Sequence, residues 1–134
     1  MRWIYDDGGR EHEGYRGHTN DCVVRAIAIA LRLKYKKAES LVIEYVEKYD
    51  KKKLPLSEGV YDTAYRPLLE DYGWFWKPMC FVGMKGRKYI NDKDVPFDIV
   101  ICSLQQHLCT VDHHVVRDTR DYSGACVFGI FTKK

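Results

Sequence analysis

The stretch that decides the fold runs from Asn20 to Leu33 and reads NDCVVRAIAIALRL. It contains no glycine or proline, and after Asp21 its only charges, Arg25 and Arg32, are spaced to share one stripe of a helix. The remaining surface of that helix is apolar, which predicts a helix buried on most sides at the centre of the fold. We expect Asn20 or Asp21 to be its N-cap, with a side-chain oxygen that accepts hydrogen bonds from first-turn amides.

Two further helices follow this stretch, and the chain then changes to strand patterns. Apolar residues at three- and four-residue steps predict a second helix over about Lys36 to Tyr49, and a third, shorter helix is predicted over Val60 to Asp71, with Gly73 as its stop. Helices followed by strands indicate an α+β fold, in which the central helix packs on a C-terminal antiparallel sheet. Residues 1–19 are polar and glycine-rich and are predicted to be an irregular lead-in to a single domain over 1–134. The predicted strands are Trp74 to Val82, Phe97 to Ser103, Gln106 to Val111, His114 to Asp118 and Ala125 to Phe131.

The composition is that of a globular protein in a reducing compartment. A hydrophobic share of 46% over 134 residues supports a buried core, and the longest apolar run, 26–31, is far shorter than the roughly 20 residues that cross a bilayer. The first residues carry acids and glycines where a signal peptide would have an apolar stretch. Five irregularly spaced cysteines favour free thiols over a disulfide framework, so we expect a cytoplasmic protein with no membrane association.

Cys22 is the first candidate for chemistry, because it lies at or within one residue of the start of the central helix. Unpaired amides and the helix dipole stabilise negative charge there, so the thiol ionises more readily. A small buried cysteine beside a helix cap is the competing interpretation, and on Cys22 alone it is the better one.

His107 and Asp118 form the second candidate feature, because two strand patterns flank a plausible two-residue turn at Asp112-His113. That turn places His107 directly opposite Asp118, with Cβ atoms roughly 5 Å apart. A carboxylate beside an imidazole fixes the tautomer of the ring, as in a nucleophile–base–orienter triad. The alternative turn at His113-His114 places Arg120 opposite His107 instead. Taken singly, a strand histidine bonded to a carbonyl and a solvated strand-end acid are the better interpretations of the two residues, and their joint occurrence with a cysteine at a helix start favours catalysis.

Three short motifs carry a resemblance to a known set of proteins. NDCVVRA at 20–26, HLCTVD at 107–112 and DTRD at 118–121 resemble the motifs of small papain-like proteins from phage and bacterial genomes. Each motif is short, but their order and spacing agree together. The closing Val127-Phe128-Gly129 is similar to the aromatic-containing last strand of that set.

The resemblance implies a papain-like fold with Cys22 as nucleophile, His107 as general base and Asp118 as orienter. It also implies a thiol hydrolase or acyl-transfer enzyme that acts on an amide or isopeptide bond of a protein or peptide, without a cofactor. A phage member of the set would act in the cytoplasm of its host. Such enzymes build the oxyanion hole from the amide of the nucleophile and an upstream donor, commonly Gln. No Gln precedes Cys22, so Asn20 or His18 is expected to substitute.

Two other classes of function fit the same residues. A non-catalytic papain-like scaffold would bind a macromolecular partner, for example as a modulator of a host protein. A nucleic-acid binder would use the lysines at 51–53, the basic Gly-x-x-Gly loop at 83–88 and the nearby aromatics, but a net charge of +3 is small for that role. One triad also serves peptidases, deamidases, transglutaminase-like enzymes and deconjugating enzymes.

A metal site is not expected from the histidines and cysteines of the strand region. Their spacing lacks the paired Cys-x₂₋₄-Cys knuckle of structural zinc sites, and core packing accounts for Cys109. The residues considered are Cys102, His107, Cys109, His113 and His114.

Overall fold

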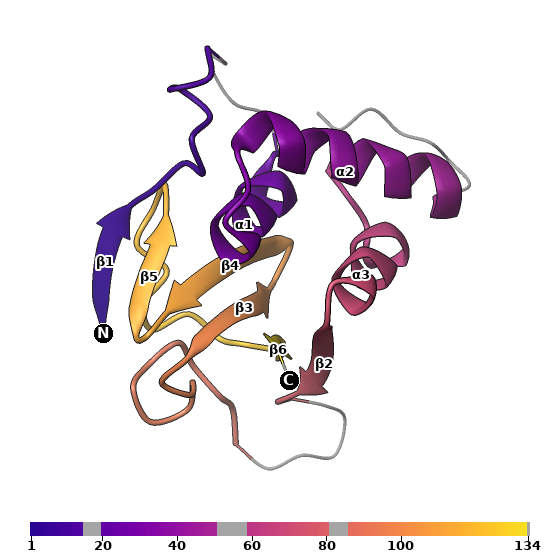
Figure 1. Ribbon diagram of the computed structural model, residues 1–134. Helices are drawn as coiled ribbons and strands as arrows, with labels where there is room; N and C mark the ends of the chain where they lie inside the picture. Colours follow the sequence, from indigo (N-terminus) through magenta and orange to yellow (C-terminus); the bar gives the residue numbers. More distant parts are fainter. Residues whose placement is uncertain (15–19, 51–58, 81–85, 134) are drawn as a thin grey trace.

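The computed structural model describes residues 1–14, 20–50, 59–80 and 86–133 (Figure 1). Within these residues three helices and a six-stranded mixed sheet form an α+β fold, which confirms the predicted class. None of the described helices combines the length and apolar character that a membrane span needs. The sheet order is β1-β5-β4-β3-β6-β2. The helices are α1 (Cys22–Leu31), α2 (Tyr35–Tyr49) and α3 (Asp62–Asp71), and the strands are β1 (Arg2–Tyr5), β2 (Trp74–Pro78), β3 (Ile99–Leu104), β4 (His107–Asp112), β5 (Val115–Asp118) and β6 (Gly129–Lys133).

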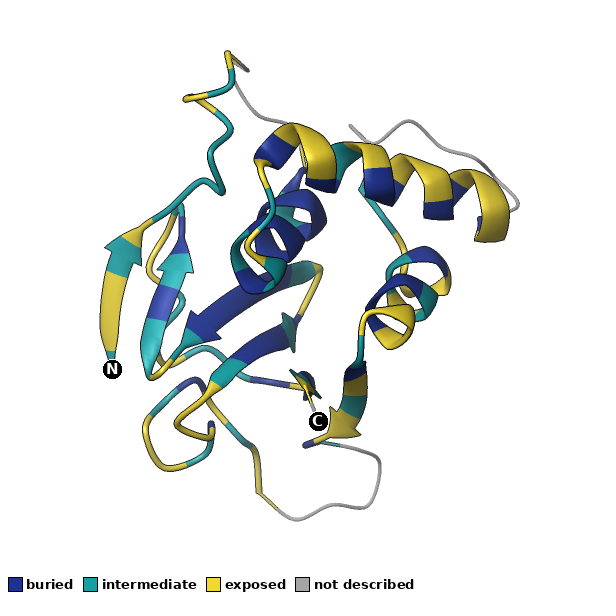
Figure 2. Cartoon of the chain, in the orientation of Figure 1, coloured by how far each residue is buried: buried dark blue, intermediate teal, exposed yellow. Residues whose placement is uncertain are grey.

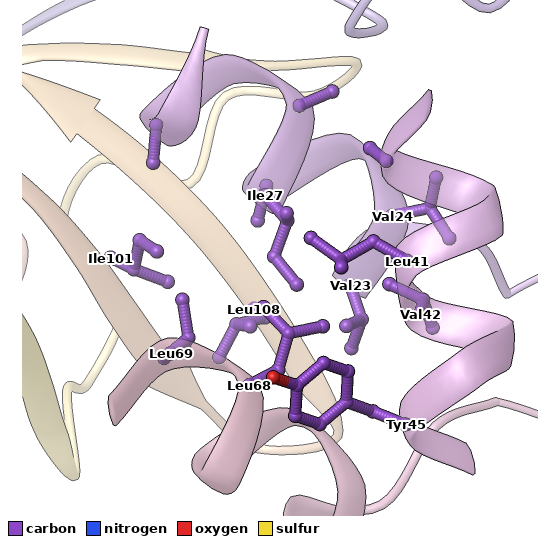
Figure 3. Packing of buried hydrophobic residues seen from close by; sticks show 14 of the residues in the cluster. Val23, Val24, Ile27, Leu41, Val42, Tyr45, Leu68, Leu69, Ile101 and Leu108 are labelled. Carbon is purple, nitrogen blue, oxygen red and sulfur yellow. The ribbon is translucent and has the colours of Figure 1, made fainter. Parts of the chain in front are cut away.

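The helix α1 is the central element, as its apolar sequence predicts. It packs on β4 on one side and on α2 on the other, and it is buried along most of its length (Figure 2). Figure 3 shows Val23 and Ile27 of α1 packed with Leu41 of α2 and Leu108 of β4. The hydroxyl of Thr110 donates a 2.8 Å hydrogen bond to the carbonyl of Ala26, which fixes α1 on the strand that carries His107.

The lead-in predicted to be irregular over 1–19 contains a strand, and this prediction was wrong for β1. The strand pairs in parallel with β5, from Arg2 opposite Val115 to Tyr5 opposite Asp118, and Figure 1 shows it at the edge of the sheet. The sheet is therefore mixed, and not the purely C-terminal antiparallel sheet that we expected. A strand of four residues between charged and glycine-rich neighbours is too short to show a period-two pattern.

The turn between β4 and β5 also differs from the prediction. Thr110 pairs with Arg117, which makes His113-His114 the two-residue turn and the predicted Asp112-His113 register wrong. Both turn residues have positive φ, 49° and 63°, as a tight hairpin of type I′ requires. The ring of Phe97 packs edge-on against both imidazoles, and the ring nitrogen Nε2 of His114 lies 2.8 Å from the carbonyl of Val95. These contacts stabilise a turn that sequence propensity alone does not select.

Candidate active site

Cys22 is the first residue of α1, where the helix dipole and unpaired amides act on its thiol. The first helical hydrogen bond runs from the amide of Arg25 to the carbonyl of Asp21, so the amides of residues 22–24 have no partner within the helix. Asp21 is the N-cap, but its side chain makes no capping bond, contrary to the expectation for this position. Its carboxylate is engaged by the side chains of Arg10, Arg25 and Tyr35 instead.

His107 and Asp118 contact each other although the predicted register was wrong. His107 Nε2 lies 2.6 Å from Asp118 Oδ2, and the Asp118 side chain is only 3% exposed. When a two-residue turn shifts by one position, the residue opposite any given residue changes by two positions along the strand. Because side chains alternate between faces with a period of two, His107 and Asp118 stay on the same face of the sheet in either register. The observed register, extended by one pair, places Asp118 opposite Cys109 and diagonal to His107. Diagonal partners are within reach of long side chains, which explains why the contact survives.

The side chains of Cys22 and His107 are joined by a hydrogen bond. Because Nε2 of His107 faces Asp118, Nδ1 is the ring nitrogen left for the thiol. Burial raises the pKa of Cys22, but the hydrogen bond and positive charge of His107, the amide of Leu108 and the charge of Arg25 outweigh it and lower the pKa below its usual value. Burial lowers the pKa of His107, and the hydrogen bonds to Asp118 and Cys22 outweigh it and raise the pKa to about 9. The two shifts favour a thiolate–imidazolium pair.

The carboxylate of Asp118 is held at every oxygen. Its Oδ1 accepts hydrogen bonds from the backbone amide of Thr119 at 2.7 Å and from Nη2 of Arg25 at 3.3 Å. The backbone carbonyl of Asp118 accepts a hydrogen bond from the indole of Trp3 and another from the amide of Asp6, both at 3.0 Å. The strand β1 therefore fixes the backbone of Asp118, and α1 fixes its side chain.

Arg25 links Asp118 to the start of α1, and sequence reasoning missed this contact. Its guanidinium donates to Asp118 and also to Asp21, which in turn accepts from Arg10 at 3.1 Å and from the Tyr35 hydroxyl at 2.8 Å. Arg25 is 8% exposed, whereas Arg32, which the pattern placed on the same stripe, is exposed at the end of α1. The available signal was a single charge, three residues after Cys22, inside an otherwise apolar stretch.

The Cys22–His107 pair opens onto a cleft with a volume of about 540 Å³. Asn20, expected as an oxyanion donor, lines this cleft, whereas His18 lies outside the described residues. Two residues that sequence reasoning missed also line it: Tyr65 of α3 and Ser103 of β3, whose hydroxyls hydrogen-bond each other. Burial raises the pKa of Tyr65 above its ordinary value, so its hydroxyl keeps its proton and can donate it. The rest of the lining comes from Val23, from residues 59–62, from Leu104 of β3 and Leu108 of β4, and from Gln106 in the turn between these strands.

The cysteines and histidines considered as zinc ligands lie in different parts of the structure. Cys102 and Cys109 face each other across β3 and β4 as buried thiols, whereas Nδ1 of His113 lies 2.6 Å from Asp112. The described part of the chain holds no group of three or more His, Cys, Asp or Glu side chains placed to bind a metal ion. The lysines at 51–53 and the first half of the basic loop, 83–85, lie outside the described residues.

Comparison of the chain with protein-family models, with curated proteins and with solved structures finds no match in any of the three.

Proposed function

We propose that the chain is a papain-like thiol hydrolase or acyl-transfer enzyme that acts on an amide or isopeptide bond of a protein or peptide. The observation that carries this proposal is the line of hydrogen bonds from Cys22 through His107 to Asp118 at the edge of a cleft. A nucleophile at a helix start, a base on a strand and a buried orienter on the next strand also fit the papain-like arrangement. All five thiols are free, which suits a reducing compartment such as the cytoplasm.

In the proposed reaction the Cys22 thiolate attacks the carbonyl carbon, and the carbonyl π electrons move to oxygen. The amide of Cys22, the side chain of Asn20 and the hydroxyl of Tyr65 are the donors that the cleft offers to this oxyanion. The oxyanion then collapses, and the C–N bond breaks as the His107 imidazolium gives its proton to the leaving amine. The acyl group remains on sulfur as a thioester.

The second half of the reaction uses the neutral imidazole that the first half produces. His107 accepts a proton from water as the water oxygen attacks the thioester, and the thiolate leaves with its electron pair. An acceptor amine in place of water gives acyl transfer. Asp118 stabilises the imidazolium in both halves and keeps Nδ1 directed at the sulfur.

The test is the pH dependence of Cys22 alkylation by iodoacetamide, followed by peptide mass mapping in wild type and in His107→Ala. We expect Cys22 to react well below pH 7 and to lose most of that reactivity in the variant. Cys126 is the internal control, because it is partly exposed and burial raises its pKa. If Cys22 titrates near its unperturbed ~8.5, or is inert in both proteins, the catalytic proposal fails and a non-catalytic binding scaffold replaces it.

A further inference from the structure

The cleft beside Cys22 carries one carboxylate that the proposed reaction does not use. It belongs to Asp62, the first residue of α3. Apart from the Cys22–His107 pair, Asp62 is the only lining residue that carries a formal charge at neutral pH among the residues that the structure describes. Within the same residues its carboxylate has no hydrogen bond or ion pair, whereas Asp21 and Asp118 are fully engaged. Asp62 is exposed, and a carboxylate that is exposed in a cleft attracts a cation.

The walls around Asp62 suit the stem of a long basic side chain. Two aromatic residues, Tyr61 and Tyr65, line the cleft together with the aliphatic residues Val60 and Leu104. Lysine and arginine lay their methylene stems along such apolar surface, while the charged head meets a carboxylate or the face of an aromatic ring. An acidic side chain would face the repulsion of Asp62, and an aliphatic one would gain no attraction from it.

We propose that the substrate carries a lysine or arginine side chain next to the scissile carbonyl and that Asp62 binds its cationic head. This inference rests on the proposed function, because the cleft is a substrate site only if Cys22 is the nucleophile. Asp62 also lies in the first turn of α3, where an acid stabilises the helix dipole. Helix stabilisation does not depend on the substrate. A change in preference among substrates therefore reports the binding role of Asp62 and not its role in the helix.

The experiment uses three chloromethyl ketones, acetyl-lysyl, acetyl-norleucyl and acetyl-glutamyl, in which a thiolate displaces chloride to form a thioether. The rate of Cys22 labelling is measured by intact mass, and the site is verified by peptide mapping. In wild type we expect the lysyl probe to react about fivefold faster than the norleucyl probe, as for a partly exposed ion pair, and the glutamyl probe to be slowest. Asp62→Asn should equalise the lysyl and norleucyl rates, and Asp62→Lys should favour the glutamyl probe.

The matched control is Glu70→Gln, which removes the same charge from α3 at a residue outside the cleft and should leave the probe preference unchanged. In wild type, raising the ionic strength should reduce the lysyl preference, which tests the inference even if an Asp62 variant does not fold. Equal rates for the three probes, with normal iodoacetamide reactivity at Cys22, would overturn the basic-side-chain subsite alone. A Cys22 that is inert to iodoacetamide as well would overturn the proposed function.

Discussion

Replacing Arg25 by methionine should be the most informative single change in this protein. The guanidinium bridges two buried carboxylates, Asp21 at 9% exposure and Asp118 at 3%. Methionine keeps much of the stem but removes the charge and the donors, so both carboxylates lose a partner inside the fold. Removing one partner of a buried ion pair costs about 3–5 kcal/mol, because the remaining charge is left buried without compensation.

The partners that remain set the expected magnitude within that range. Asp21 keeps Arg10 and the Tyr35 hydroxyl, and Asp118 keeps His107 and the amide of Thr119. Neither carboxylate is therefore left bare, and we expect a loss of ~3 kcal/mol, the lower end of the range. The loss of the Arg25 charge also predicts a second effect, on the thiol of Cys22. The positive charge of Arg25 helps to lower the pKa of Cys22, so its loss should move thiol alkylation to higher pH.

Urea denaturation at pH 7 measures the first effect, with Arg32→Met as the matched control on the same helix. Arg32 is exposed, so its replacement should change the free energy of unfolding by less than about 0.5 kcal/mol. For Arg25→Met the urea midpoint should fall by about 1 M or more. Equal midpoints for the two variants would refute the reasoning, because they would show that the bridge between the carboxylates contributes nothing to the fold.

Three further predictions concern the proposed triad and its cleft. The pKa of His107 is about 9 when folded against 6.5 when unfolded, so its stabilisation is complete below pH 6.5 and is lost as the pH rises through about 9. Urea melts should therefore show the stability advantage of wild type over His107→Gln shrinking between pH 7 and pH 10, and an advantage that grows would contradict the assigned ion pair. Asp118→Asn removes the charge that favours the imidazolium, so Cys22 alkylation should shift to higher pH, by less than in His107→Ala; an unchanged profile would exclude the orienting role. Tyr65→Phe should slow acylation of Cys22 by a p-nitrophenyl ester on the order of 10²-fold while leaving iodoacetamide alkylation unchanged, and a variant as fast as wild type would remove this hydroxyl from the oxyanion site.

The parts of the site that follow from local pattern were accessible from the sequence. The apolar run after Asp21 predicted the central helix and placed Cys22 at its start, and the structure has both. The contact between His107 and Asp118 was predicted from the wrong register, and it survives because the observed register makes the two residues diagonal instead of opposite partners. A hairpin prediction of this kind is robust to a shift of the turn, although the partner of each residue is not.

The parts that depend on contacts between distant segments were not accessible. Nothing in the pattern of residues 2–5 indicates a strand, because their pairing is supplied by β5. The role of Arg25 depends on Asp118, which only the packing of α1 on the sheet brings within reach. Asp21 was predicted as a cap from its position, but its carboxylate oxygens accept hydrogen bonds from Arg10, Arg25 and Tyr35 instead of from the first-turn amides. The capping preference of Asp21 could be predicted from local sequence, whereas its ion pairs with Arg10 and Arg25 depend on the folded structure.

The pairing of β1 with β5 also determines when the proposed nucleophile can become active during synthesis. Trp3 and Asp118, which the indole hydrogen bond joins, are 115 residues apart in the chain. At ribosomal rates of about 5–20 residues per second, β5 follows β1 by roughly 6–23 s. Until β5 emerges, His107 lacks the Asp118 carboxylate, whose hydrogen bond and charge raise the pKa of the imidazole. In the proposed mechanism, the complete triad therefore forms only after nearly the whole chain has been synthesised.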